Sequence, residues 1–238
     1  IGAEFEDRNV DIYNARALES PTSLDREGFE LRNQATLIED FYQIEQVRES
    51  YDSEVIALVL SATGAQEAMV FDHTLRSDSR AVRGIQNTRE PASVIHNDYS
   101  DNSARKRLTD LLPAGEAKRR LQRRFAIVNV WRSINGVILD SALACCDARS
   151  IADEELIASE RRAAERVGEL QLVSWGKTHR WYYFPHMQPD ETLLIKTFDS
   201  SLDGRARRSV HTAFHDPSAP VDVPARESIE SRLLVFFE

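Results

Sequence analysis

The segment Val94-Ile95-His96-Asn97-Asp98-Tyr99 places an imidazole and a carboxylate two residues apart. The apolar run at 92–95 predicts the end of a β-strand that delivers both side chains into a polar loop. In an extended backbone, residues i and i+2 point to the same side of the strand. We therefore expect His96 and Asp98 to hold one cation from adjacent positions.

A further histidine from a distant part of the chain would complete a set of two histidines and one carboxylate, the ligand set of non-haem Fe(II) oxygenases. His211 is the preferred candidate because it opens the strand-like run at 210–214. Several strand-like runs separate it from Asp98, and in a double-stranded barrel they return the chain beside its starting strand. His186 and His215 compete for the same role.

An arginine and a serine two residues apart, Arg226 and Ser228, follow the last histidines. In a strand their side chains point the same way, so a guanidinium and a hydroxyl can bind one carboxylate together. This pair predicts an anchor for the far carboxylate of 2-oxoglutarate, whose keto-acid end would chelate the iron. Arg232 is the alternative anchor. An ion pair of Arg226 with Glu230 or Asp222 is the purely structural explanation.

Size and composition are typical of a globular protein, with 238 residues, 42% hydrophobic and 29% charged. A net charge of −9 argues against a nucleic-acid partner. No apolar run approaches the roughly 18 residues of a membrane span, and residues 1–4 do not resemble a secretory signal, so no membrane partner is expected. The adjacent Cys145 and Cys146 rarely form a disulfide with each other, which favours a reducing, cytoplasmic location.

The order of predicted elements favours one domain over residues 1–238, mainly β with flanking α-helices, folded as a double-stranded β-helix or jelly roll. Residues 1–90 are expected to be largely helical or irregular, and residues 91–238 to carry the jelly-roll core with helical insertions. The predicted helices cover residues 45–63, 101–112, 114–124 and 151–167. The predicted strands cover residues 10–13, 68–71, 92–95, 125–131, 169–174, 179–185, 192–198, 210–214 and 228–237. Residues 179–199 are expected to form a hairpin that turns at 188–191.

Segments spread over nearly the whole chain resemble a known family. They are VDIYNAR (10–16), REGF (26–29), FDHTLR (71–76), HNDY (96–99), NVWR (129–132), HRWYYFP (179–185) and RESIESR (226–232). Together they resemble the fungal hydroxylase/desaturase family, which includes gibberellin-desaturase-like proteins and relatives of the cephamycin methoxylation protein.

The resemblance implies a jelly-roll Fe(II)/2-oxoglutarate-dependent dioxygenase that uses O₂ to oxidise a small-molecule secondary metabolite. Carried onto this chain, it implies that His96, Asp98 and His211 are the metal ligands. Oxidation of 2-oxoglutarate to succinate and CO₂ would accompany hydroxylation, desaturation or oxidative cyclisation of the substrate. A non-catalytic jelly-roll protein that binds a metabolite or a metal is the alternative, and a metal-dependent isomerase or hydrolase is a third hypothesis. The sequence is compatible with a homo-oligomer.

Other polar side chains have weaker functional interpretations. His73 and His179 are candidates for contacts around the metal or the substrate, and Asn129 and Arg132 for contacts with substrate or co-substrate. Strand alternation divides the aromatic residues between the core and the pocket wall. These aromatic residues are Trp131, Trp181, Tyr182, Tyr183 and Phe184.

Overall fold

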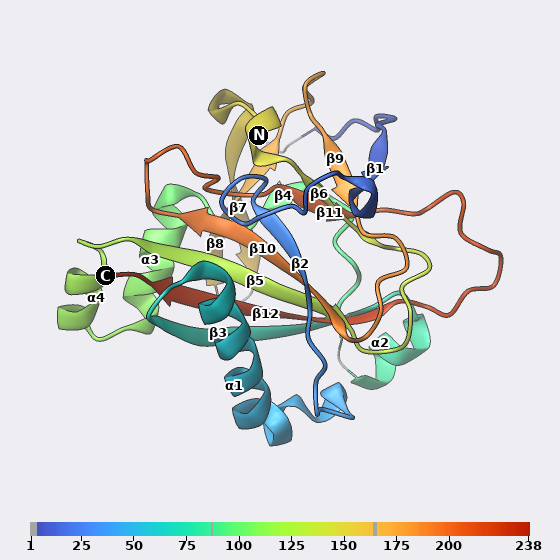
Figure 1. Cartoon of the computed structure of the whole chain (residues 1–238), viewed down its shortest axis with the longest axis horizontal. Helices are drawn as coiled ribbons and strands as arrows, with labels where there is room; N and C mark the ends of the chain where they lie inside the picture. Colours follow the sequence, from blue (N-terminus) through green and yellow to red (C-terminus); the bar gives the residue numbers. More distant parts are fainter. Residues whose placement is uncertain (1–3, 87, 164–165) are drawn as a thin grey trace.

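Two β-sheets lie face to face in the computed structural model, which describes residues 4–86, 88–163 and 166–238 (Figure 1). One sheet has seven strands in the order β1-β9-β6-β11-β4-β8-β7, and the other has five in the order β2-β10-β5-β12-β3. This two-sheet arrangement confirms the predicted mainly β, jelly-roll architecture. The described residues contain no helix whose length and apolar character would suit it to crossing a membrane.

The strands of the seven-stranded sheet are β1 (Ile12–Asn14), β4 (His96–Asn97), β6 (Leu143–Cys146), β7 (Leu156–Ala163), β8 (Arg166–Val173), β9 (Trp181–Tyr183) and β11 (His211–Ala213). The five-stranded sheet consists of β2 (Phe29–Asn33), β3 (Glu67–Ser77), β5 (Phe125–Ser133), β10 (Glu191–Asp199) and β12 (Glu227–Phe236). The helices are α1 (Ile44–Thr63), α2 (Arg80–Gln86), α3 (Asp101–Leu111) and α4 (Ala114–Arg120).

Strand β5 is buried on both faces, and its alternation assigns each face a different neighbour. Ala126, Val128 and Val130 pack in the cluster that includes α1, which covers the outer face of the five-stranded sheet (Figure 1). Ile127 and Trp131 belong to clusters on the opposite face, where the two sheets meet. The inward face of β5 therefore also carries Asn129, the residue between them.

Helix α1 begins and ends close to where the sequence pattern predicts. Its last turn stops at Gly64, which adopts a left-handed φ of +67° and donates its N–H to the carbonyl of Leu60. Glycine is the residue that adopts this conformation at the lowest cost. The helices predicted at 101–112 and 114–124 are confirmed as α3 and α4.

The predicted helix at 151–167 is wrong. After a single 3₁₀ turn at Asp153–Glu155, the described residues form β7 and β8, paired antiparallel with Leu156 opposite Val173. The segment is rich in glutamate, arginine and alanine, which favour helix locally. Pairing of β8 with β4 overrides this preference, because it extends the seven-stranded sheet.

The predicted hairpin at 179–199 is also wrong. Strand β9 pairs with β1 and β6 in the seven-stranded sheet, whereas β10 pairs with β2 and β5 in the five-stranded sheet. The turn between them therefore crosses from one sheet to the other. Alternation of apolar residues cannot distinguish these two cases, because strands in either arrangement bury one face.

The N-terminal portion contributes more to the sheets than its composition suggests. Residues 1–90 were expected to be largely helical or irregular, with strands at 10–13 and 68–71. These strands overlap β1 and β3, whereas β2 of the five-stranded sheet was not predicted. The polar stretch between β3 and β4 contains the short helix α2. The strand expected at 92–95 is wrong: these residues form no strand, and β4 begins only at His96, although the carbonyl of Ala92 accepts the N–H of Ala213.

Candidate functional site

Two histidines lie side by side on neighbouring strands of the seven-stranded sheet. His96 on β4 is directly opposite His211 on β11, and the centroids of their rings are 4.8 Å apart. Asp98 follows β4 immediately. One ligand atom from each of the three side chains lies within 4.8 Å of the other two. The structure therefore brings together the three residues that the sequence singled out.

Backbone carbonyls fix the orientation of both imidazole rings. Nδ1 of His96 lies 2.7 Å from the carbonyl oxygen of Val94, and Nδ1 of His211 lies 3.1 Å from that of Ser209. A carbonyl oxygen only accepts hydrogen bonds, so each Nδ1 carries the proton when the ring is neutral. The lone pair of each ring is then on Nε2. Both histidines thus offer Nε2 to a cation, as metal-bound histidines commonly do.

The two oxygens of Asp98 have different surroundings. Oδ1 lies 3.3 Å from Nε2 of His96. Oδ2 accepts hydrogen bonds from Nδ2 of Asn129 at 2.8 Å and from Nε of Arg232 at 3.0 Å. Both donors come from the five-stranded sheet, where they are paired across β5 and β12. The opposite sheet therefore holds Oδ2 in place and leaves Oδ1 directed at the histidines.

The charges around Asp98 keep it ionised. Burial alone would raise the pKa of Asp98, but the Arg232 charge and the hydrogen bond with His96 hold this pKa well below its usual range. Burial and the neighbouring His96 lower the pKa of His211. Burial also disfavours the charged form of His96, but the hydrogen bond and charge of Asp98 outweigh it and raise the pKa of His96. Binding of a cation and protonation of His96 therefore compete.

A buried guanidinium lies beside the triad. Arg226 is 4% exposed, and it lines the same small cavity as His96 and His211. Its Nη1 donates to the carbonyl of Ser141 at 2.6 Å, and its Nε donates to Oγ of Ser228 at 3.2 Å. The guanidinium also lies 5.1 Å from the ring centroid of Trp131.

Arg226 makes no ion pair with a carboxylate in the described part of the chain, so neither structural partner considered above, Glu230 or Asp222, is used. Burial lowers the pKa of Arg226 to about 10, which still leaves it charged at neutral pH. A buried charge without a counter-ion is costly, and an incoming carboxylate would relieve this cost. Arg232, the alternative anchor, is already in contact with Asp98, Asp72 and Glu230.

The remaining histidines lie away from the triad. His73 on β3 contacts Asp52 of α1 through Nε2 at 2.7 Å, on the outer side of the five-stranded sheet. His179 is 3.0 Å from Glu155. His215 is 2.7 Å from Asp140, and His186 is exposed. The structure therefore does not bring His73, His179, His186 or His215 to the candidate metal site.

Asn129 and Arg132 were both candidates for substrate or co-substrate contacts, and the structure separates them. Asn129 reaches Asp98, as described above. Arg132 points to the other face of β5, where Nη2 donates to Oγ1 of Thr192 at 2.8 Å and the guanidinium lies 6.0 Å from the ring of Tyr51. Of the aromatic residues, Trp131 lines the small cavity, whereas Trp181 packs in a cluster with Cys146.

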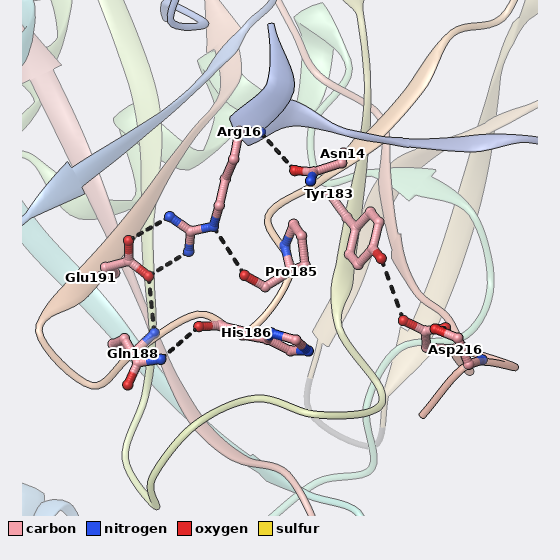
Figure 2. Close-up of a pocket in the computed structure, with 9 residues that line it drawn as sticks. Asn14, Arg16, Tyr183, Pro185, His186, Gln188, Glu191 and Asp216 are labelled. Atoms are coloured by element: carbon pink, nitrogen blue, oxygen red, sulfur yellow. Dashed lines mark hydrogen bonds and ion pairs between the residues drawn. The ribbon is translucent and has the colours of Figure 1, made fainter. Parts of the chain in front are cut away.

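A wider hollow of about 600 Å³ lies elsewhere, near β1 and β9, and Figure 2 shows the side chains that line it. Arg16 binds Glu191 through two hydrogen bonds of 2.7 and 2.6 Å. The hydroxyl of Tyr183 donates to Asp216 at 3.4 Å. Arg16 and Asp216 thus already have partners, and this hollow contains none of the triad residues, so we do not assign the reaction to it.

Sequence reasoning missed several features of the site. Asn129 and Arg232 both donate hydrogen bonds to Asp98 because β5 pairs with β12. The local sequence does not predict this pairing. The carbonyl of Ser141 as a partner of Arg226 was also missed. Ser141 has a left-handed φ of 50°, which its sequence context does not signal.

Comparison with known proteins finds relatives named as hydroxylase/desaturases and dioxygenases. A family model described as an oxidoreductase/YMDC permease-like domain matches residues 2–236. The chain is 33% identical to hydroxylase/desaturase efuI of Hormonema carpetanum, over 99% of this chain and 85% of that relative. It is also 33% identical to the Fe(II)/2-oxoglutarate-dependent dioxygenase nvfI of Aspergillus novofumigatus, over 95% of this chain and 82% of that relative.

A solved structure shares the fold. The iron and alpha-ketoglutarate-dependent endoperoxidase NvfI superposes with a TM-score of 0.86 at 30% sequence identity. The match covers 96% of this chain and 85% of the NvfI chain. The likeness therefore extends over both sheets and the segments that carry the triad.

Proposed function

Because the chain belongs to the fungal hydroxylase/desaturase family of Fe(II)/2-oxoglutarate-dependent oxygenases, we propose that its triad holds the catalytic iron. The ligands are Nε2 of His96, Nε2 of His211 and Oδ1 of Asp98. The observation that carries this proposal is the convergence of these three residues beside the buried guanidinium of Arg226, which has no carboxylate counter-ion in the part of the chain that the structure describes.

The donor set fits Fe(II). Two imidazole nitrogens and one carboxylate oxygen form the set found on one face of non-haem iron in oxygenases, which leaves positions open for co-substrate and O₂. Carbonyl bonds at both Nδ1 atoms present Nε2 in the form that binds a metal. The low pKa of Asp98 supplies the negative charge.

The co-substrate is placed by residues of the five-stranded sheet. Arg226 and Ser228 bind the far carboxylate of 2-oxoglutarate, and the ring of Trp131 covers the guanidinium and limits access of water. Iron held by the triad would supply, with 2-oxoglutarate and O₂, the oxidising chemistry that removes hydrogen from the substrate, with succinate and CO₂ as co-products. Asn129 and Arg232 keep Asp98 directed at the iron throughout.

The substrate is a small-molecule secondary metabolite, and its reaction is hydroxylation, desaturation or oxidative cyclisation. The names of the relatives, which include hydroxylase/desaturases and an endoperoxidase, support this range of outcomes. A cytoplasmic location is supported by the two adjacent cysteines, which are buried and not joined in a disulfide.

The test measures iron binding and turnover in the same preparation. We expect the purified chain to bind one Fe(II) and to release succinate from 2-oxoglutarate when Fe(II) and ascorbate are supplied. His96→Ala removes one of three ligands, so its Fe(II) affinity should fall by about 100-fold or more and succinate release should disappear.

His215→Ala is the matched control, because His215 is exposed and bonded to Asp140 outside the site. It should keep the Fe(II) affinity and the succinate release of the unmodified protein. Unchanged Fe(II) affinity in His96→Ala would show that the ligands are misassigned. Iron binding without any Fe(II)-dependent succinate release across a panel of metabolites would favour a binding protein instead.

A further inference from the structure

A second cavity of about 500 Å³ opens beside the triad, and His96 and Asp98 line it on one side. Its other walls come from β3, the residue Arg89, helix α3 and the hairpin of β7 and β8. This volume falls within the range of sites for small organic molecules. Because it borders His96 and Asp98 and is not lined by Arg226, it offers room for a substrate beside the candidate metal site.

The acidic groups in this wall already have partners. Asp72 and Asp98 are both paired with Arg232. Glu169 on β8 accepts a hydrogen bond from the hydroxyl of Ser100, and Glu160 on β7 is likewise engaged. Among the described residues, Asp72, Asp98 and Glu169 form no ion pair with Arg76, Arg89 or Arg107.

Three guanidiniums in the same wall, those of Arg76, Arg89 and Arg107, make no ion pair with a carboxylate among the described residues. Arg76 on β3 donates only to the backbone carbonyl of Glu90, at 2.6 Å. Arg107 on α3 lies 4.7 Å from the ring centroid of Phe71, and its buried Nε has no hydrogen-bond partner. Lys106 differs from them, because both oxygens of Asp110 bind it at 2.8 Å.

The strand geometry explains why these charges gather here. Arg76 lies near the end of β3, and Arg89 returns beside it in a parallel bridge, held by a bond from its N–H to the carbonyl of Leu75. Helix α3 contributes Arg107 to the wall of the same cavity, beside Phe71 of β3. Segments far apart in the sequence thus place three guanidiniums around one cavity beside the candidate metal site, and among the described residues none of the three has a carboxylate partner.

We propose that this cavity selects a substrate with an acidic group, a carboxylate or an ionised enol or phenol, attached to an apolar ring system. The guanidiniums of Arg89 and Arg107 bind the acidic group, and Phe71, Tyr99 and Leu170 of the same wall contact the apolar part. Arg76 also lines the small cavity that contains His96 and His211, and it adds its charge from that side. This inference rests on the proposed function, because it takes the triad as the place of reaction.

The test uses a matched pair of probes, 2-naphthoate and the neutral 2-naphthamide. Binding of each is measured by calorimetry to protein loaded with Mn(II) and 2-oxoglutarate, which occupy the metal site without turnover. We expect 2-naphthoate to bind at least about 10-fold more tightly than 2-naphthamide, and Arg89→Gln and Arg107→Gln each to reduce this preference to less than about 3-fold. Arg107→Lys, which keeps the charge, should restore part of it.

Arg105→Gln is the matched control, because Arg105 is an exposed residue of α3 that does not line the cavity. It should keep the full preference, and the melting temperature of each variant shows that the fold is intact. Equal binding of the two probes, binding of neither, or a preference that survives both glutamine variants would overturn the proposal. Failure of Mn(II) and 2-oxoglutarate to bind would instead overturn the proposed function, so the two failures are distinguishable.

Discussion

Asp98 shows how one residue can be controlled from the opposite sheet. Its Oδ2 accepts hydrogen bonds from both Asn129 and Arg232, so only Oδ1 remains for a cation. Groups that orient a metal ligand in this way commonly change metal affinity by 10- to 100-fold. The sequence suggested Arg232 as an alternative anchor for the co-substrate. Its contacts show instead that it holds Oδ2 of Asp98.

Asn129→Ala tests this arrangement, because it removes the Nδ2 donor to Asp98 together with the Oδ1 acceptor of the Thr197 hydroxyl. We expect Fe(II) affinity to fall by about 10-fold or more, since Oδ2 of Asp98 becomes freer to rotate. Metal titration measures the effect, and the melting temperature reports the fold. Asn135→Ala, at an exposed loop residue bonded to Glu227, is the control. An Fe(II) affinity equal to that of the control would show that Asn129 does not position Asp98.

Arg226→Gln separates the proposed co-substrate anchor from the proposed metal site. Loss of a buried charge pair costs about 2 kcal/mol or more, so 2-oxoglutarate affinity should fall by about 30-fold or more while metal affinity stays within about 3-fold. Calorimetry with the Mn(II)-loaded protein measures both values, with Arg105→Gln as the surface control. If 2-oxoglutarate bound equally well to the variant, Arg232 or another cation would have to be the anchor.

Individual elements differ in how far local sequence defines them. Helix α1 was predicted because its apolar period and its terminal Gly64 agree with each other. Segment 151–167 was predicted as a helix from composition and capping residues, but it forms β7 and β8 in the described residues. The difference lies in tertiary pairing, since α1 satisfies its own backbone groups, whereas β8 satisfies them with β4 and β7.

Gly64→Ala tests the termination of α1. A Cβ at this position would meet no atom within 4 Å, so the expected cost of about 1 kcal/mol in unfolding free energy arises from the left-handed φ alone. Gly115→Ala is the matched control. Gly115 lies within α4 with an ordinary φ, so Gly115→Ala should raise the unfolding free energy by about 0.5–1 kcal/mol. Urea unfolding measures both, and a shift of the same sign in both variants would contradict this explanation.

The location of the site depends on how the two sheets pack together. Each sheet supplies part of it: β4 and β11 present the imidazoles, while β5 and β12 present Asn129, Arg232 and the approach to Arg226. A network of ion pairs joins distant segments where β10 ends and β5 begins in the five-stranded sheet. Buried Asp199 binds Arg124 at 2.7 Å and Lys196 at 3.0 Å, and Lys196 also reaches Asp25 at 2.6 Å.

Asp199→Asn should destabilise the whole fold, because it leaves buried Lys196 without its closest buried counter-ion. We expect a loss of about 3–5 kcal/mol in unfolding free energy at pH 7, measured in urea. Asp110→Asn, at an exposed helical ion pair, is the control and should change little. A loss no larger than that of the control would show that the network does not contribute to stability.

Because of Asp199, we also expect the unfolding free energy to depend on pH. Burial would raise the pKa of Asp199, but hydrogen bonds from Arg124 and the charge of Lys196 lower it below the unfolded value of about 3.9. Its contribution is therefore complete above that unfolded value and is lost as the pH falls through the folded pKa. Unfolding free energies measured from pH 7 to pH 3 should fall more steeply for the unmodified protein than for Asp199→Asn.

The sequence by itself determined the chemistry of the residues and the elements that are local. His96 with Asp98, His211, and Arg226 with Ser228 could be picked out because a metal site and a carboxylate anchor require these residue types in that order. Helices α1, α3 and α4 could be predicted because their hydrogen bonds close within a few residues. The resemblance to a known family extended this knowledge to the fold.

Only the tertiary structure decided how these pieces meet. It placed β9 and β10 in different sheets, turned a predicted helix into β7 and β8, and gave Asn129 and Arg232 a shared hold on Asp98. It also gathered Arg76, Arg89 and Arg107 around one cavity. The physical reason is that pairing of strands and burial of charge depend on partners far away in the chain, and no local pattern encodes those partners.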